Sequence, residues 1–378
     1  MSPAPSPPAM LGAVGPDAHI DDQRYLRARL VALCFNRAFD ADTASVWHAP
    51  STLVLLGGRR QGPSLSLATH WRAMVAARAR EDRALRIHLL GSGDETTDLT
   101  LDDEGTDADA PKEAASIAAV VRTLARRGHL DCGLDLLRVT DVPTGVGLGV
   151  DASVRAAVAW AVSGLSARSG SGPALSPAEL VTALDEASGS AADHQVCVST
   201  AEGYVALARP GALGEGSLHE VRLDAAHHGF RLVLVTLRVP PGSPAPTVWE
   251  PAVTEDALAE EGFGLFASSE VESPVTDLPQ RVGSLLDASH AAAIRQRAPV
   301  VTDRFVIAAR AAGALGARAV SSRAMLAAVA TTQVATVRRA VLAACGEQPE
   351  THLGARFLTT AGVAGAGQGA REIEGFSQ

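Results

Sequence analysis

The sequence predicts an α+β protein of two domains, and three observations lead to this prediction. The chain has 378 residues, which is enough for two domains that each bury a core. Segments with the apolar runs of strands are mixed with segments of helical periodicity, without the strict rhythm of a doubly wound sheet. Near the middle, a glycine-rich turn at 141–151 opens directly into a long apolar helix, around which we expect the chain to be organised.

The first half of the chain combines helices with strand-like apolar runs. Residues 1–16 are rich in Pro, Ala and Ser, and we expect a disordered tail over 1–20. The stretch at 91–110, rich in Asp, Thr and Gly, predicts a solvated loop or an edge hairpin. Hydrophobic periodicity predicts helices at 21–39, 112–127 and 152–168, and strands at 45–57, 74–79, 85–90 and 134–140.

The second half continues the same mixture. Ser176-Pro-Ala-Glu179 begins a helix, because it combines a capping box with Pro at the first helical position. A Pro-rich connector is expected at 240–251. The remaining pattern predicts strands at 196–198, 203–208, 230–239 and 355–360, and helices at 278–293, 302–312 and within 324–345.

Composition limits the partners and the compartment. The formal net charge is −9, so binding to nucleic acid or to an anionic membrane has no electrostatic support. No apolar run reaches membrane-spanning length. The four cysteines lie far apart without a C-x-x-C pair, which favours buried thiols in a reducing compartment over zinc ligands or disulfides. We therefore expect a cytoplasmic protein.

The glycine-rich turn reads Asp141-Val-Pro-Thr-Gly-Val-Gly-Leu-Gly-Val-Asp151. Its glycines, Gly145, Gly147 and Gly149, allow positive φ and a close approach of the backbone to a ligand. The helix that follows offers free N–H groups and the positive end of its dipole, a combination typical of a phosphate cradle. Gly-rich turns before helices also arise from packing alone. The turn is neither a P-loop, since no Lys-Ser/Thr follows it, nor a dinucleotide motif, since its glycine spacing differs.

This turn resembles the second motif of the GHMP small-molecule kinases, and among them galactokinase, which reads approximately Val-Pro-x-Gly-x-Gly-Leu-Ser-Ser-Ser-Ala. The residues shared with this motif are Val142, Pro143, Gly145, Gly147, Leu148 and Ala152. Gly149-Val150-Asp151 replaces its serines. The resemblance implies a ribosomal-S5-like N-terminal domain at 21–200, a ferredoxin-like C-terminal domain at 201–378, and a ligand cleft between them. It also implies ATP and Mg²⁺ as cofactors.

Other stretches follow the galactokinase order over most of the chain. Residues 39–50 resemble the approach to the family's first motif, and 313–318 the approach to its third. Residues 281–290 resemble its Ser-His helix. Gly189-Ser-Ala-Ala-Asp-His-Gln195 stands in place of the family's Gly-Ile-Met-Asp-Gln, which puts Asp193 on the family's catalytic Asp.

All three motifs depart from the family pattern. Ser51-Thr52 replaces Gly-Arg, whose Arg lies beside the transferred phosphate in the family. Gly58-Arg59-Arg60-Gln61 replaces the Glu-His-Thr-Asp that grips the sugar. Arg59 is a candidate for the substrate site, where it would neutralise phosphate charge; a solvated basic loop is the alternative. Residues 319–326 lack the glycines of the third motif, which removes backbone freedom.

Asp151 has two interpretations. It stands near the family's Mg²⁺-binding serine, and Mg²⁺ prefers carboxylate oxygens. Asp is also a strong N-cap residue, and in that role its carboxylate accepts from the N–H groups that a phosphate would use. The N-cap preference favours the second interpretation, in which the mouth of the helix is partly filled by the protein's own carboxylate.

The candidate site residues follow from the resemblance. Asp193 is the candidate general base, or the charge that orients the acceptor hydroxyl; a turn Asp is the alternative. His194 is a candidate proton partner in the substrate site, or a structural histidine. Asp151 is the candidate Mg²⁺ ligand. The candidate ATP-binding residues are Pro143, Gly145, Gly147, Leu148, Gly149, Asp151 and Ala152.

Two functions are consistent with these motifs. One is ATP-dependent phosphorylation of a hydroxyl group on a sugar or cyclitol, with galactose an unexpected substrate because the sugar-gripping carboxylates are gone. The other is a catalytically silent galactokinase paralogue that binds a metabolite or acts as a regulatory protein, as the changes in all three motifs suggest. In both, the partner is a small molecule, and neither nucleic acid nor a membrane is involved.

Overall fold

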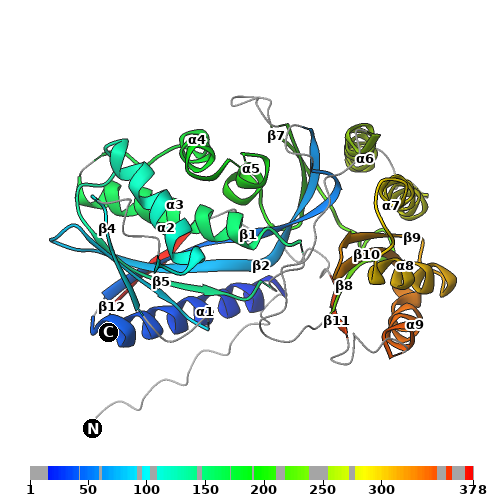
Figure 1. The fold of residues 1–378 in the computed structure, drawn as a ribbon, viewed down its shortest axis with the longest axis horizontal. Helices are drawn as coiled ribbons and strands as arrows, with labels where there is room; N and C mark the ends of the chain where they lie inside the picture. Colours follow the sequence, from blue (N-terminus) through cyan, green and yellow to red (C-terminus); the bar gives the residue numbers. More distant parts are fainter. Residues whose placement is uncertain are drawn as a thin grey trace, which may run out of the picture.

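The computed structural model describes residues 16–41, 43–58, 62–91, 96–102, 109–142, 147–170, 172–189, 191–209, 218–237, 254–271, 277–346, 355–359 and 371–377. Within these ranges the strands form an eight-stranded sheet and a four-stranded sheet. Each sheet carries its own helices, and the two assemblies lie side by side (Figure 1). Separate hydrophobic clusters form around them, which agrees with a chain long enough for more than one core.

The larger sheet is built on two long antiparallel strands, β1 (Thr43–Gly57) and β2 (Ser64–Ala79). The main strand order is β12-β1-β2-β5-β3-β4, and β6 pairs with β2 and with β7 beside this path. The other strands are β3 (Ala84–Leu89), β4 (Thr96–Thr100), β5 (Leu134–Thr140), β6 (Tyr204–Ala208), β7 (Leu218–Arg222) and β12 (Arg371–Ser377).

Helices cover both faces of this sheet (Figure 1). α1 (Pro16–Phe39) packs on the face that carries Val46 and Met74. The opposite face is covered by α2 (Lys112–Arg126), α3 (Val150–Ser169), α4 (Pro177–Ser188) and α5 (Ala191–Ser199). The buried side of α3 is mostly Ala and Val, so the helix lies close to the strands: a Cβ atom added at Gly164 would come within 2.8 Å of the Trp47 indole nitrogen.

The smaller sheet has the strand order β11-β8-β10-β9. Its strands are β8 (Phe230–Leu237), β9 (Gly316–Ser321), β10 (Ala324–Ala330) and β11 (Ala355–Thr359). Alternate residues of β8 and β10 face opposite sides, as the period of a strand requires. One side packs on α6 (Thr254–Val271) and α7 (Leu278–Ile294), toward the larger sheet, and the other on α8 (Val301–Ala311) and α9 (Val334–Gly346).

Most predicted elements are confirmed, including the Ser176 capping box, in which Ser176 accepts from the Glu179 amide. One prediction was wrong. Residues 196–198 lie inside helix α5, because three apolar residues are too few to specify a strand. The helix expected within 324–345 is α9, and it begins only at Val334. Residues 324–330 before it form strand β10 despite their Ala-rich composition, because they pair with β8 and β9 on both sides.

Several predictions concern regions that the structure describes only in part. The connector at 240–251 and residues 1–15 of the expected tail lie outside the described residues, and α1 begins at Pro16. The stretch at 91–110 contains the edge strand β4, paired with β3. β6, β7 and β12 follow residue 200 in the chain and belong to the larger sheet; the division at residue 200 stays a prediction. None of the described helices is long and apolar enough to cross a bilayer.

Candidate functional site

The glycine-rich turn joins β5 to α3. Residues 143–146 lie outside the described residues, so the predictions for Pro143 and Gly145 stay predictions. Gly147 and Gly149 both have positive φ, at +77° and +53°, a conformation that side-chain-bearing residues seldom adopt. Gly149 is the N-cap of α3. The expected use of glycine for a left-handed backbone is therefore confirmed at these two positions.

Both glycines are pressed against neighbouring elements. A Cβ atom added at Gly149 would lie 2.3 Å from Thr52 Oγ1 on β1, and one at Gly147 would lie 2.8 Å from Val320 Cγ1 on β9. Residues 319–326, which were compared with the third motif, form the hairpin between β9 and β10. The turn is thus held between the two sheets, and a valine side chain makes the contact from the hairpin.

No side chain caps the start of α3 within the described part of the chain. Asp151 lies in the first helical turn, two residues after the N-cap, and its side chain is exposed. The interpretation of Asp151 as the N-cap was wrong, because the left-handed backbone at Gly149 sets the start of the helix. Leu148 and Ala152 are buried and anchor the turn in the core. Among the described residues, no carboxylate therefore caps the N–H groups at the mouth of α3.

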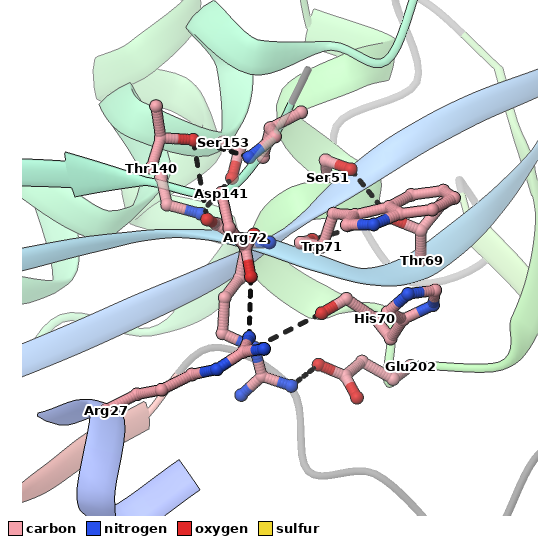
Figure 2. Close-up of polar contacts among 12 residues, drawn as sticks. Arg27, Ser51, Thr69, His70, Trp71, Arg72, Thr140, Asp141, Ser153 and Glu202 are labelled. Atoms are coloured by element: carbon pink, nitrogen blue, oxygen red, sulfur yellow. Dashed lines mark hydrogen bonds and ion pairs between the residues drawn. The ribbon is translucent and has the colours of Figure 1, made fainter. Parts of the chain in front are cut away.

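A buried hydroxyl faces this mouth. Thr52 is 1% exposed, and its Oγ1 has no hydrogen-bond partner in the described part of the structure. Leaving such a group unpaired costs about 1–3 kcal/mol. Its neighbours are satisfied. Ser51 and Thr69 share a hydrogen bond of 2.6 Å (Figure 2). Ser153 Oγ donates to the Ala49 carbonyl at 2.8 Å. Thr52 thus offers an unused polar atom beside Gly149.

A charged cluster anchors the other end of the turn (Figure 2). Asp141 accepts from the Arg72 backbone N–H at 2.7 Å and from Arg27 Nη1 at 2.6 Å. The Arg72 guanidinium pairs with the buried Glu202 carboxylate. Two arginines face two carboxylates here, so the cluster is balanced in charge and joins α1, β2 and the turn. Sequence reasoning missed it, because residues 72 and 202 are far apart in the chain.

An aromatic pair lies next to this cluster on β2. The rings of His70 and Trp71 are 4.3 Å apart between centroids. Burial lowers the pKa of His70, and the nearby Asp141 carboxylate partly offsets this shift. His70 is therefore largely neutral near pH 7.

Asp193 and His194 lie on α5, which packs against α3 and β1. Burial raises the pKa of Asp193, and no cation pairs with its carboxylate within the described residues. Burial, with a smaller contribution from Arg155, lowers the pKa of His194 to about 3. His194 Nε2 lies 3.4 Å from Ser188 Oγ, and its Nδ1 has no partner among the described atoms. His194 is thus a buried neutral imidazole at physiological pH.

The match to known proteins extends over most of the chain in structure and over a third of it in sequence. No family model matches the chain. A stretch of 136 residues is 27% identical to galactokinase from Streptomyces coelicolor and covers 35% of each chain, so the match spans about a third of that relative. The structure is similar to that of Lactococcus lactis galactokinase complexed with galactose, with a TM-score of 0.72, 17% identity and coverage of 91% of this chain and 99% of that one. The chain has the GHMP kinase fold.

A second structural neighbour supports this identification. Mevalonate kinase from Methanococcus jannaschii gives a TM-score of 0.57 at 12% identity, with 84% of this chain and 98% of that chain covered. The predicted α+β class and the GHMP fold are thereby confirmed. In this GHMP fold the glycine-rich turn lies where two sheets meet, which is where ligand sites commonly form.

The residues of this GHMP fold fit a phosphate-bound Mg²⁺ better than a metal held by protein alone. No three His, Cys, Asp or Glu side chains come together as a ligand set among the residues that the structure describes. Mg²⁺ in kinases is usually held by one or two carboxylates together with phosphate oxygens. An exposed Asp151 in the first turn of α3 meets that requirement. Arg59 lies outside the described residues, so its role stays a prediction.

Proposed function

We propose that this protein binds a nucleoside triphosphate at the mouth of α3 and transfers a phosphoryl group to a hydroxyl of a sugar or cyclitol other than galactose. The observation that carries the proposal is the open start of α3. A left-handed glycine caps the helix, and the buried Thr52 hydroxyl faces that glycine with no hydrogen-bond partner among the described residues. Free N–H groups and the helix dipole attract phosphate at such a position.

Each candidate residue has a distinct role in this proposal. The backbone at Gly147 and Gly149 and the hydroxyl of Thr52 bind phosphate oxygens. Asp151 holds Mg²⁺, which when bound neutralises charge on the phosphates. Asp193 accepts a hydrogen bond or a proton from the acceptor hydroxyl, and its raised pKa brings it closer to the working pH of a general base.

The choice of acceptor follows from the residues that replace the first motif. Arg59-Arg60-Gln61 stands where galactokinases carry side chains that grip the sugar, including carboxylates. Without those carboxylates, galactose loses its hydrogen-bond acceptors in the site. We therefore expect a different polyhydroxylated acceptor.

One observation favours a second candidate function, a catalytically silent paralogue that binds a metabolite or regulates another protein. Thr52 stands where the family has the Arg beside the transferred phosphate, and it is buried and neutral. A hydroxyl can bind phosphate, but it cannot neutralise the charge that develops during transfer. This paralogue would bind a ligand without turning it over.

Two measurements on the full chain separate these functions. Thermal unfolding is followed with and without ATP and Mg²⁺, because a ligand that binds the folded state raises the melting temperature. Phosphorus NMR then follows ATP in the presence of a panel of sugars and cyclitols. A kinase shows stabilisation and a new phosphate ester. Stabilisation without turnover supports the silent paralogue. If neither stabilisation nor turnover is observed, the proposal is overturned.

A further inference from the structure

The end of β1 is held from the other sheet by a buried charged group. Leu55 lies where the pairing register of β1 with β2 is interrupted, and Gly57 is the last residue of the strand. Arg318 Nη1 donates to the Leu55 carbonyl at 2.9 Å, and the Gly57 N–H donates to Glu255 Oε2 at 3.2 Å. Backbone groups at a bulge need partners outside the ladder, and here they come from β9 and α6.

A serine on α7 completes the group. Ser289 Oγ donates to Glu255 Oε1 at 2.7 Å and lies 2.9 Å from Arg318 Nη1, while Glu255 and Arg318 are 3.4 Å apart. All three side chains are buried, and they come from three elements of the second half of the chain. Ser289 belongs to the stretch compared with the family's Ser-His helix, and Arg318 to the approach to the third motif.

The start of α6 also packs closely against both stems of the connection between β1 and β2, that is, its first and last residues. A Cβ atom at Gly57 would lie 3.1 Å from Ala259 Cβ, and one at Gly62 would lie 2.3 Å from Asp256 Oδ1. The stems are joined to each other by a hydrogen bond of 3.1 Å from the Gly58 N–H to the Pro63 carbonyl. Glu255 and its neighbours on α6 therefore fix where this connection leaves the sheet.

The surroundings of the group favour a geometric role over a stabilising one. The elements that carry the three side chains contribute to one buried hydrophobic cluster. This cluster contains Leu53, Leu56, Leu65 and Leu285. A buried ion pair adds little net stability relative to apolar residues of similar volume, because both charges must be desolvated. What the pair supplies, and apolar residues would not, is a pair of directed hydrogen bonds to the end of β1.

We propose that Glu255, Ser289 and Arg318 form a clamp of positioning residues that fixes the end of β1 at 55–58, which the proposed function places on the acceptor side of the site. The effect on the acceptor rests on the proposed function. The effect on the end of β1 does not, since it is a property of the folded chain alone.

Hydrogen exchange tests the clamp without any assay of activity. The variant Glu255→Leu/Arg318→Met replaces the pair by apolar residues, and Ser289→Ala removes only the hydroxyl. We expect amide exchange at 55–58 to accelerate at least tenfold in the double variant and severalfold in Ser289→Ala, with α3 unchanged. Arg209→Met, which removes an exposed ion pair to Glu260 on the same helix α6, is the matched control and leaves exchange at 55–58 unchanged. Unchanged protection at 55–58 in both clamp variants overturns the proposal.

A kinetic experiment then tests the link to the acceptor. If the wild-type protein transfers phosphate, the double variant should raise the acceptor KM at least tenfold while the Kd for MgATP changes less than threefold. Arg318→Lys, which keeps the charge with fewer donors, should restore part of the loss. An unchanged acceptor KM overturns the link. A wild-type protein that transfers no phosphate refutes the proposed function, and the exchange result then decides the clamp by itself.

Discussion

At the scale of single residues, the unpaired hydroxyl of Thr52 distinguishes a ligand site from a packing contact. A buried threonine whose Oγ has no partner destabilises the fold unless a ligand uses it. Thr69, close by on β2, provides the contrast because its Oγ1 is paired with Ser51. The two threonines differ in hydrogen bonding more than in burial.

Thr52→Val should leave the free energy of unfolding unchanged or raise it by about 1 kcal/mol, because it removes an unsatisfied buried group. The same change should weaken ATP binding about tenfold, which corresponds to about 1.4 kcal/mol. Thr69→Val, the control, should cost about 1 kcal/mol of stability and leave ATP affinity unchanged. Urea denaturation and calorimetric titration measure both. Equal losses of stability in the two variants, with ATP affinity unaffected, would contradict this view of Thr52.

His194 gives the chain a pH-dependent stability. Its pKa is about 3 in the folded protein and near 6.5 in an unfolded chain, so between these values the unfolded state binds the extra proton. The contribution of the neutral His194 to the free energy of unfolding is therefore fully present above pH 6.5. It is lost as the pH drops toward 3, by up to about 1.4 kcal/mol per pH unit. Asp193, whose pKa is raised by burial, acts in the opposite direction.

The measurement is urea denaturation at pH 7 and pH 5 for the wild-type protein and for His194→Leu. The variant removes the titrating group, so the difference in unfolding free energy between the two pH values should shrink. The same pH dependence in both proteins would show that other groups cause it.

At the scale of elements, the start of α3 is set by backbone conformation, and the side chains adapt to it. Gly149 is left-handed and lies against Thr52, while Asp151 is an exposed residue of the first turn and not the cap. A second left-handed glycine, Gly170, ends the same helix with open space around it. A comparison of the two ends of α3 therefore separates the energetic cost of a left-handed side chain from the cost of a close contact.

Gly149→Ala should destabilise the protein more than Gly170→Ala. Both changes place a side chain in the left-handed region at a cost of about 1–2 kcal/mol. Only the first also forces a methyl group toward Thr52 Oγ1, at 2.3 Å. Thermal and chemical denaturation of the two variants give the comparison, and equal losses would show that the contact with Thr52 is easily relieved.

Asp151→Asn tests the role of the first turn. Since Asp151 is not the cap, its removal should cost only the helix-dipole interaction, about 0.3–1 kcal/mol. Magnesium-free ATP should bind more tightly to the variant, because a like charge is gone, and the gain from adding Mg²⁺ should fall. Titrations of ATP with and without Mg²⁺ measure this. An unchanged response to Mg²⁺ would remove Asp151 from the metal site.

The limits of sequence reasoning also lie at this scale. The turn and α3 could be predicted because glycine conformation and helix periodicity are local properties. β10 could not, because its Ala-rich residues favour a helix until β8 and β9 flank them. The position of the cap could not be read either, since Asp at 151 is a good cap residue wherever the backbone permits one.

At the scale of the whole molecule, contacts between distant residues assemble the site. Glu202 reaches Arg72, and Arg318 reaches Leu55 from the other sheet. Only the resemblance to a known family could anticipate the fold, and no local pattern predicts these pairs. The arrangement places the open mouth of α3 between β1 of one sheet and β9 of the other.

The central claim is that this mouth receives the phosphates of a nucleotide. Its most direct test is the change in backbone amide NMR signals when MgATP is added to the isotope-labelled full chain. We predict that the largest shifts fall on Gly147, Gly149 and the first turn of α3. Absence of shifts at millimolar MgATP, or shifts confined to other parts of the chain, would contradict the claim.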